Sequence, residues 1–225
     1  VGDLAEALWG RHDSRTGDGE RKAVPDGDFR QIDALVREAH RRGDYAEMRR
    51  LGERMLDLAA TPLERAGARM RVGNAWLDEG RFTRALEWLQ AAADDHEAGG
   101  HVLEMVRVNL ATAHLALWNL SEAEGLARLV LLGTASLDRA SRRIRVTEAH
   151  AHYVIGSALQ RKVQSMSLEA APAAAIKAID SLRRAHADHE ALHREFDDPT
   201  YQGIANTCRA AILEMEVEAG LLDLD

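Results

Sequence analysis

The segment Arg71–Ala92 (RVGNAWLDEGRFTRALEWLQAA) limits most strongly what this chain can fold into. Its pattern predicts a helix that ends at Glu79, a corner at Gly80 and a second helix from Thr83. Gly80 suits the left-handed backbone that commonly ends a helix. Gly73 is small enough to let the second helix touch the first. The segment is therefore expected to form a helical hairpin with closely packed arms.

Small and aromatic residues in this segment follow the order that is typical of the tetratricopeptide repeat, a family of helical hairpins. The matching positions are Gly73, Trp76, Gly80, Phe82, Ala85, Leu89 and Ala92. The segment resembles such a repeat, and seven ordered matches within 22 residues distinguish it from a general amphipathic hairpin.

The pattern recurs along the chain. Gly43 precedes Gly80 by 37 residues and Trp118 follows it by 38, so corners are predicted at both positions. At the later corner we expect Asn119 to take the left-handed backbone, because asparagine tolerates it better than most residues. A fourth copy is predicted around Gly156.

Proline marks the boundaries of the later helices. Pro172 is expected to open the second helix of the fourth copy, roughly Ala173–Glu195, since proline fits the first turn of a helix. A final helix, about Thr200–Ala219, is interpreted as a cap. The resemblance thus implies an all-α, right-handed superhelical solenoid of about four hairpins plus a C-terminal capping helix.

Three regions are predicted: 1–27, a short helix and a mobile linker; 28–220, the repeat domain; and 221–225, a tail. The period exceeds the 34 residues of the commonest tetratricopeptide form. Longer repeats of this kind are similar to those of bacterial peptide-sensing regulators and of regulators of the maltose-activator type.

Composition excludes several classes of protein. The formal net charge of −8 argues against direct nucleic-acid binding, which needs a basic face. The sequence contains no apolar run long enough to span a membrane and no secretory signal. Cys208 is the only cysteine, so an intrachain disulfide is impossible. We expect a cytoplasmic, bacterial protein.

The resemblance also nominates a ligand site, because the first helix of each tetratricopeptide hairpin lines a concave groove. Asparagine can bond a peptide backbone as donor and acceptor, and arginine can grip carboxylates. Asp33 and Asp78 fall on the same helix faces as the expected peptide-binding residues. These residues are Arg37, Arg41, Met70, Arg71, Asn74, Asn109, Thr112, His150, Tyr153, Ser157 and Arg161.

The segment HADHEALH places His186, His189 and His193 along one helix face. Three histidines without a fourth ligand make a poor zinc site, so a solvated polar face is predicted. The sequence contains no phosphate loop, nucleophile elbow or dinucleotide fingerprint. No catalytic residue, metal or cofactor is therefore expected, and the chain is not expected to be an enzyme.

The favoured function is an adaptor or scaffold that binds a protein or peptide partner in its groove. Two alternatives stay open. In the first, the chain is a ligand-sensing domain of a transcription regulator whose DNA-binding part lies outside this sequence. In the second, it is a self-assembling repeat protein that forms homodimers through exposed apolar ends of the repeat array.

Overall fold

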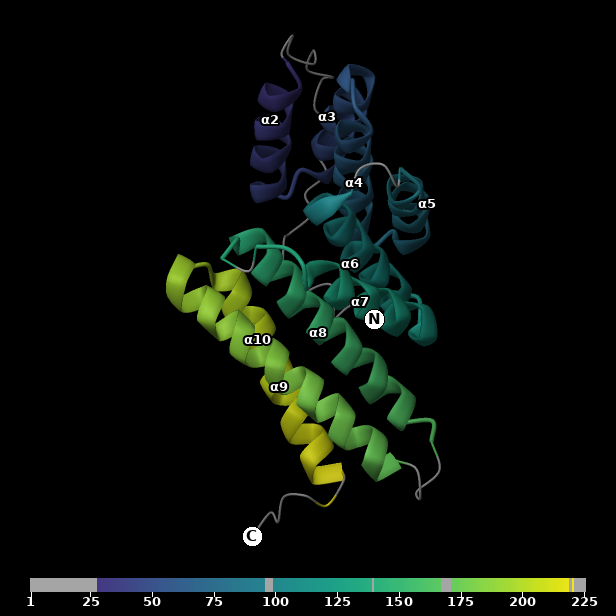
Figure 1. Cartoon of the computed structure of the whole chain (residues 1–225), viewed down its shortest axis with the longest axis vertical. Helices are drawn as coiled ribbons and strands as arrows, with labels where there is room; N and C mark the ends of the chain where they lie inside the picture. The colour runs from purple at the N-terminus through teal and green to yellow at the C-terminus, as the bar shows by residue number, and fades with distance from the viewer. Residues whose placement is uncertain (1–27, 96–98, 139, 167–170, 219, 221–225) are drawn as a thin grey trace. The chain divides into compact units, whose positions relative to one another are not determined.

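A computed structural model describes residues 28–95, 99–138, 140–166, 171–218 and 220 (Figure 1). Within these residues the chain contains nine helices and no strand, which confirms the all-α prediction. The short helix, linker and tail predicted for 1–27 and 221–225 lie outside them. None of the helices described could cross a membrane, because each is too short or too polar. The chain divides into two compact units, described over 28–106 and 107–220, which we call the N-terminal and C-terminal units.

The N-terminal unit is built from helices of which the first four pack on their neighbours in chain order. They are α2 (Phe29–Arg41), α3 (Tyr45–Leu58), α4 (Pro62–Asp78) and α5 (Phe82–Ala93), followed by the start of α6 (Gly100–Ala116). Asp28 and Thr61 begin α2 and α4 with reciprocal capping boxes, and Pro62 occupies the first turn of α4.

The C-terminal unit contains the rest of α6, then α7 (Leu120–Thr134), α8 (Arg142–Val163), α9 (Ala171–Phe196) and α10 (Pro199–Glu218). Within it α7 packs on α8, α8 on α9 and α9 on α10. Figure 1 shows α8, α9 and α10 as long helices side by side, with α9 running against both of the others in direction. Pro172 lies in the first turn of α9 and Pro199 begins α10, as the sequence indicates.

Three helix corners share one hydrogen-bond pattern. Gly43, Gly80 and Trp118 have φ angles of 68°, 76° and 63°. At each corner the next residue donates its N–H to the carbonyl five residues back, with N···O distances of 2.8–2.9 Å. This is the Schellman arrangement, which satisfies a carbonyl at the end of a helix. The recurrence predicted from the sequence therefore appears in the backbone at all three positions.

The third corner differs from the prediction in one detail. The left-handed residue is Trp118, whereas Asn119 has an ordinary φ of −79°. Arg161 of α8 stacks over the indole ring of Trp118, with its guanidinium carbon 4.7 Å from the ring centroid. The same arginine donates to the carbonyl of Leu115, one of the last carbonyls of α6. A tryptophan contacted from α8 thus takes the backbone conformation that glycine adopts at the other two corners.

Each unit has its own apolar core. In the N-terminal unit it includes Ile32, Val36, Leu51 and Met55. In the C-terminal unit it contains many alanines, together with Val154, Leu182 and Cys208. Burial raises the pKa of the Cys208 thiol to about 12, so the thiol stays protonated and unreactive at neutral pH.

Candidate peptide-binding face

A polar cluster joins α2 and α4 in the N-terminal unit. Arg71 of α4 donates from Nε to Oδ1 of Asp33 on α2 at 2.9 Å, and its Nη2 lies 2.9 Å from the same oxygen. Arg37, one turn beyond Asp33, also pairs with this carboxylate. Burial would raise the pKa of Asp33, but Arg71 and Arg37 outweigh it and hold that pKa below its usual value.

A second contact lies two turns further along the same helices. His40 Nε2 of α2 is 3.2 Å from Oδ2 of Asp78 on α4. The Asp78 side chain is only 2% exposed, and burial raises its pKa, with His40 opposing the shift. The pKa of His40 is raised, chiefly by its contact with Asp78. Both groups therefore keep their protons to a higher pH than they would in water.

The acids of this cluster are recessed and Arg37 and His40 are outermost, whereas Arg71 is 24% exposed and lies between these two levels. The side chains of Asp33 and Asp78 are 16% and 2% exposed, whereas those of Arg37 and His40 are 57% and 44% exposed. Arg41 is also exposed and pairs with Glu38 on its own helix. Buried carboxylates can thus fix the position of cationic groups that are themselves partly exposed.

The face continues along α4 toward its N-terminus. Asn74 is half-buried between Arg71 and Asp78, and it already has an interaction within the chain. Gly67 lies one turn before Arg71, and a Cβ atom placed there would meet nothing within 4 Å. Leu63, one further turn back, has an exposed side chain. We call the surface formed by Asp33, Arg37, His40, Leu63, Gly67, Arg71, Asn74 and Asp78 the α2–α4 face.

Met70 had been expected on this face, but its side chain is buried in the N-terminal unit. It stands one residue before Arg71, about 100° around α4, and so turns toward the core. The sequence did not predict three members of this face, His40, Leu63 and Gly67. Of these, His40 lies seven residues after Asp33 and therefore on the same side of α2, a spacing that could have identified it.

The expected groove residues of the C-terminal unit are mostly covered by the chain itself. Thr112 is buried and donates its hydroxyl to the carbonyl of Val108 at 2.9 Å. Tyr153, Ser157 and His150 are buried on α8, which packs against both α7 and α9. Because α8 has a neighbour on each of two sides, its side chains are covered, whereas a helix that lines a groove would expose them.

The other two expected residues of this unit are partly accessible. Asn109 is half-buried and has an interaction within the chain. Arg161 donates a hydrogen bond from Nη1 to the carbonyl of Leu115, and its guanidinium group stacks on the ring of Trp118. Of the eleven expected residues, those that the structure brings together at a partly exposed face are Arg37, Arg71 and Asn74. Arg41 lies beside them on α2.

The three histidines of α9 do not form the solvated face that the sequence predicts. His189 is fully buried and its Nδ1 lies 2.8 Å from the Ala185 carbonyl. His186 and His193 are half-buried, and their Nδ1 atoms lie 3.0 Å from the carbonyls of Ala205 and Asp198. Because a carbonyl can only accept, Nδ1 carries the proton in each ring. These side chains join α9 to its own backbone, to α10 and to the corner between them.

A buried aromatic cluster surrounds His189. The ring centroid of His150 lies 6.4 Å from that of His189, and the ring centroid of Tyr201 lies 6.2 Å from that of His189. Burial, together with His189, lowers the pKa of His150 to about 3, and burial also lowers the pKa of His189. Burial raises the pKa of Tyr153 to about 12. His150 and His189 are therefore neutral in the folded core of the C-terminal unit.

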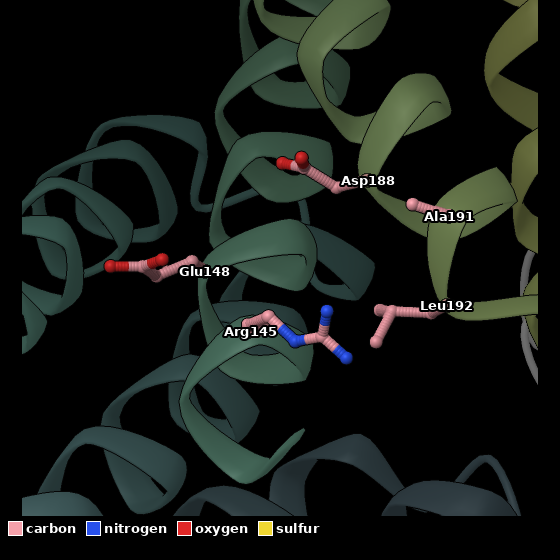
Figure 2. A pocket seen from close by; sticks show the side chains of 5 residues that line it. All are labelled: Arg145, Glu148, Asp188, Ala191 and Leu192. Carbon is pink, nitrogen blue, oxygen red and sulfur yellow. The ribbon is translucent and has the colours of Figure 1, made fainter. Parts of the chain in front are cut away.

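A cavity of about 220 Å³ lies between α8 and α9 (Figure 2). It is lined by Arg145, Glu148, Asp188, Ala191 and Leu192. Figure 2 shows the Glu148 carboxylate directed away from α9, so it does not converge with that of Asp188. Among the residues that the structure describes, no group of three His, Cys, Asp or Glu could hold a metal ion. The cavity therefore does not bring its two carboxylates together.

Comparison of the sequence with protein-family models and with curated proteins gives no match.

Proposed function

We propose that this protein is a peptide-binding repeat module and that the α2–α4 face holds an extended, acidic segment of a protein partner. The hairpins would stack as a right-handed solenoid of the tetratricopeptide type. Three equivalent corners, at Gly43, Gly80 and Trp118, support a repeated unit. In this arrangement α2 and α4 are successive first helices, the elements that carry ligands in such repeats.

The observation that carries the proposal is the layering of charge on the α2–α4 face. Asp33 lies beneath Arg37 and Arg71 and contacts both guanidinium groups. A guanidinium held in this way loses less conformational freedom when a ligand arrives. Its remaining N–H donors match the geometry of a carboxylate. An acidic side chain or a C-terminal carboxylate is therefore the ligand group that fits best.

The spacing of the contacts favours an extended ligand. The Asp33–Arg71 and His40–Asp78 contacts each join residues 38 positions apart, and they are separated by seven residues along both helices. Seven helical residues span about 10 Å, which is the length of about three extended residues. A short acidic segment along the helices would meet Arg71 and Arg37 at one end and His40 at the other.

The test uses fluorescein-labelled decapeptides in which glutamate alternates with alanine, with glutamine replacing glutamate in the control peptide. Fluorescence anisotropy should show tighter binding of the glutamate peptide, and binding should weaken as salt is added. Arg71→Ala should weaken it roughly tenfold or more, because charged hydrogen bonds are lost. Arg37→Ala should weaken it less, since Arg37 is more exposed.

Arg84→Ala is the matched control. Arg84 belongs to the same unit, is exposed and pairs with Glu87 on its own helix, but it lies on α5. Arg84→Ala changes the net charge of the chain by the same amount as Arg71→Ala, and it should leave peptide binding unchanged. The proposed function is wrong if the two peptides bind equally well, or if Arg84→Ala weakens binding as much as Arg71→Ala.

A further inference from the structure

The outer face of α10 carries exposed aliphatic side chains. Its inner face carries Tyr201, Ile204, Cys208, Ile212 and Met215, all of which are buried. On the opposite side Leu213 is 48% exposed and Val217 is 40% exposed. Asn206 and Ala210 are exposed on the same side. We call the surface formed by Asn206, Ala210, Leu213 and Val217 the α10 seam.

The α10 seam has the spacing of a helix-pairing surface. Its residues follow one another at intervals of four, three and four, the alternation by which coiled-coil helices meet. Two large aliphatic side chains on this face, one turn apart and exposed at this spacing, therefore point to a packed neighbour.

The charges beside the seam indicate what that neighbour is. Arg209 and Glu214 flank the seam on opposite sides and are exposed. Arg209 has no hydrogen bond or ion pair with any other residue that the structure describes. Glu214 accepts only a 3.2 Å hydrogen bond from Gln160 there. In a parallel helix pair, residues at these two flanking positions, five apart, face each other across the seam.

We infer that two copies of this chain associate through parallel α10 helices. Leu213 and Val217 pack against their counterparts, and Arg209 of each copy pairs with Glu214 of the other. The surface is therefore complementary to itself, as a two-fold dimer requires. A seam of about two heptads is at the small end of stable interfaces, so the dimer dissociates on dilution.

The first experiment is sedimentation equilibrium of the intact chain across a wide range of concentrations. The expected result is a reversible monomer–dimer equilibrium. Leu213→Lys should raise the dimer dissociation constant by at least about tenfold, because it places a charge in the centre of the seam. Leu129→Lys is the matched control, since Leu129 on α7 is 49% exposed. It should leave the dissociation constant unchanged, and circular dichroism should show that both variants keep their helices.

The second experiment tests the orientation of the pair. Arg209→Glu and Glu214→Arg should each weaken the dimer by roughly threefold to tenfold, because each change creates like-charge pairs. An equimolar mixture of the two variants should form heterodimers as readily as the unsubstituted chain, since both pairs across the seam are then opposite in charge.

Three results would overturn the inference. The first is a chain that stays monomeric at all concentrations, which would mean that another segment or partner covers the α10 seam. The second is a dimer that Leu213→Lys and Leu129→Lys affect equally. The third is a mixture of the charge variants that associates no better than either variant alone, which excludes the parallel arrangement.

Discussion

Gly73 and Leu89 lie so close together that a side chain at Gly73 would overlap the leucine. A Cβ atom built on Gly73 would be 2.7 Å from Leu89 Cγ. The same relationship recurs between Gly156 and Leu182, where the corresponding distance is 2.6 Å. In both hairpins a leucine of the second helix fits against a glycine of the first, so the helices approach within reach of backbone contact.

Gly73→Ala should therefore destabilise the protein by roughly 1–3 kcal/mol, because the added methyl group overpacks the hairpin. Gly67→Ala, on the same helix, is the control. Its Cβ would meet nothing within 4 Å, and alanine is the better helix former, so stability should stay the same or rise by up to about 1 kcal/mol. Urea unfolding of both variants measures the difference. Equal effects of the two substitutions would show that the Gly73–Leu89 contact is not tight in solution.

Leu89→Ala should cost on the order of 3 kcal/mol, because Leu89 is fully buried and the substitution leaves a cavity. Trp76→Ala should lower the free energy of unfolding by less, since Trp76 is only half-buried. The guanidinium carbon of Arg49 lies 4.0 Å from the centroid of the Trp76 ring. Thermal unfolding followed by circular dichroism ranks the two. A larger loss for Trp76→Ala would contradict this ordering.

His189→Ala should destabilise the C-terminal unit by about 2–4 kcal/mol, because it empties a buried volume and removes the hydrogen bond to Ala185. Arg184→Ala, at an exposed position on the same helix, should have little effect. Hydrogen exchange over residues 142–218 measures the change within that unit. An unaltered exchange rate in the His189 variant would restore the expectation of a solvated histidine face.

Acid should destabilise the C-terminal unit. The pKa of His150 in the folded chain is about 3, below the 6.5 of the unfolded chain. Folding therefore favours the neutral ring, and this contribution is complete above pH 6.5 and is lost as the pH falls toward 3. Between pH 6.5 and about pH 4.5 the loss should be roughly 2–3 kcal/mol for this residue alone.

His150→Gln removes that titration, so its stability should fall less over the same pH interval, as unit-resolved hydrogen exchange can show. His189 adds a contribution of the same sign, because its pKa is also lowered by burial. If the unsubstituted chain and the variant lose equal stability on acidification, His150 is not the group responsible.

The His40–Asp78 contact should have the opposite dependence on pH. The pKa of His40 is raised in the folded chain, so its stabilising effect is complete below the ordinary histidine pKa. The effect is lost as the pH rises through the raised value. His40→Gln should therefore destabilise the N-terminal unit most at mildly acidic pH and least in alkaline solution. Urea unfolding at several pH values tests this, and a difference that grows with pH would contradict it.

Local sequence determined the helices and most of their ends. Capping boxes at Asp28 and Thr61, prolines at the starts of α4 and α10, and the glycine corners all act within one or two turns. Their effect can therefore be predicted without knowing what packs nearby. The close approach at Gly73 was predictable for the same reason, because an absent side chain leaves room in any hairpin.

Tertiary structure decided which polar residues stayed accessible. His150, Tyr153 and Ser157 of α8 are buried because helices pack on two sides of α8, and Met70 turns inward while Arg71 beside it does not. His189 is buried where α10 packs on α9, and Arg161 of α8 reaches Trp118 at the corner after α6. Such outcomes depend on residues tens of positions away, whose distances in space a periodic pattern does not contain. The sequence alone therefore determined that the chain forms packed helical hairpins, and the packing between helices decided which of their faces could bind a partner.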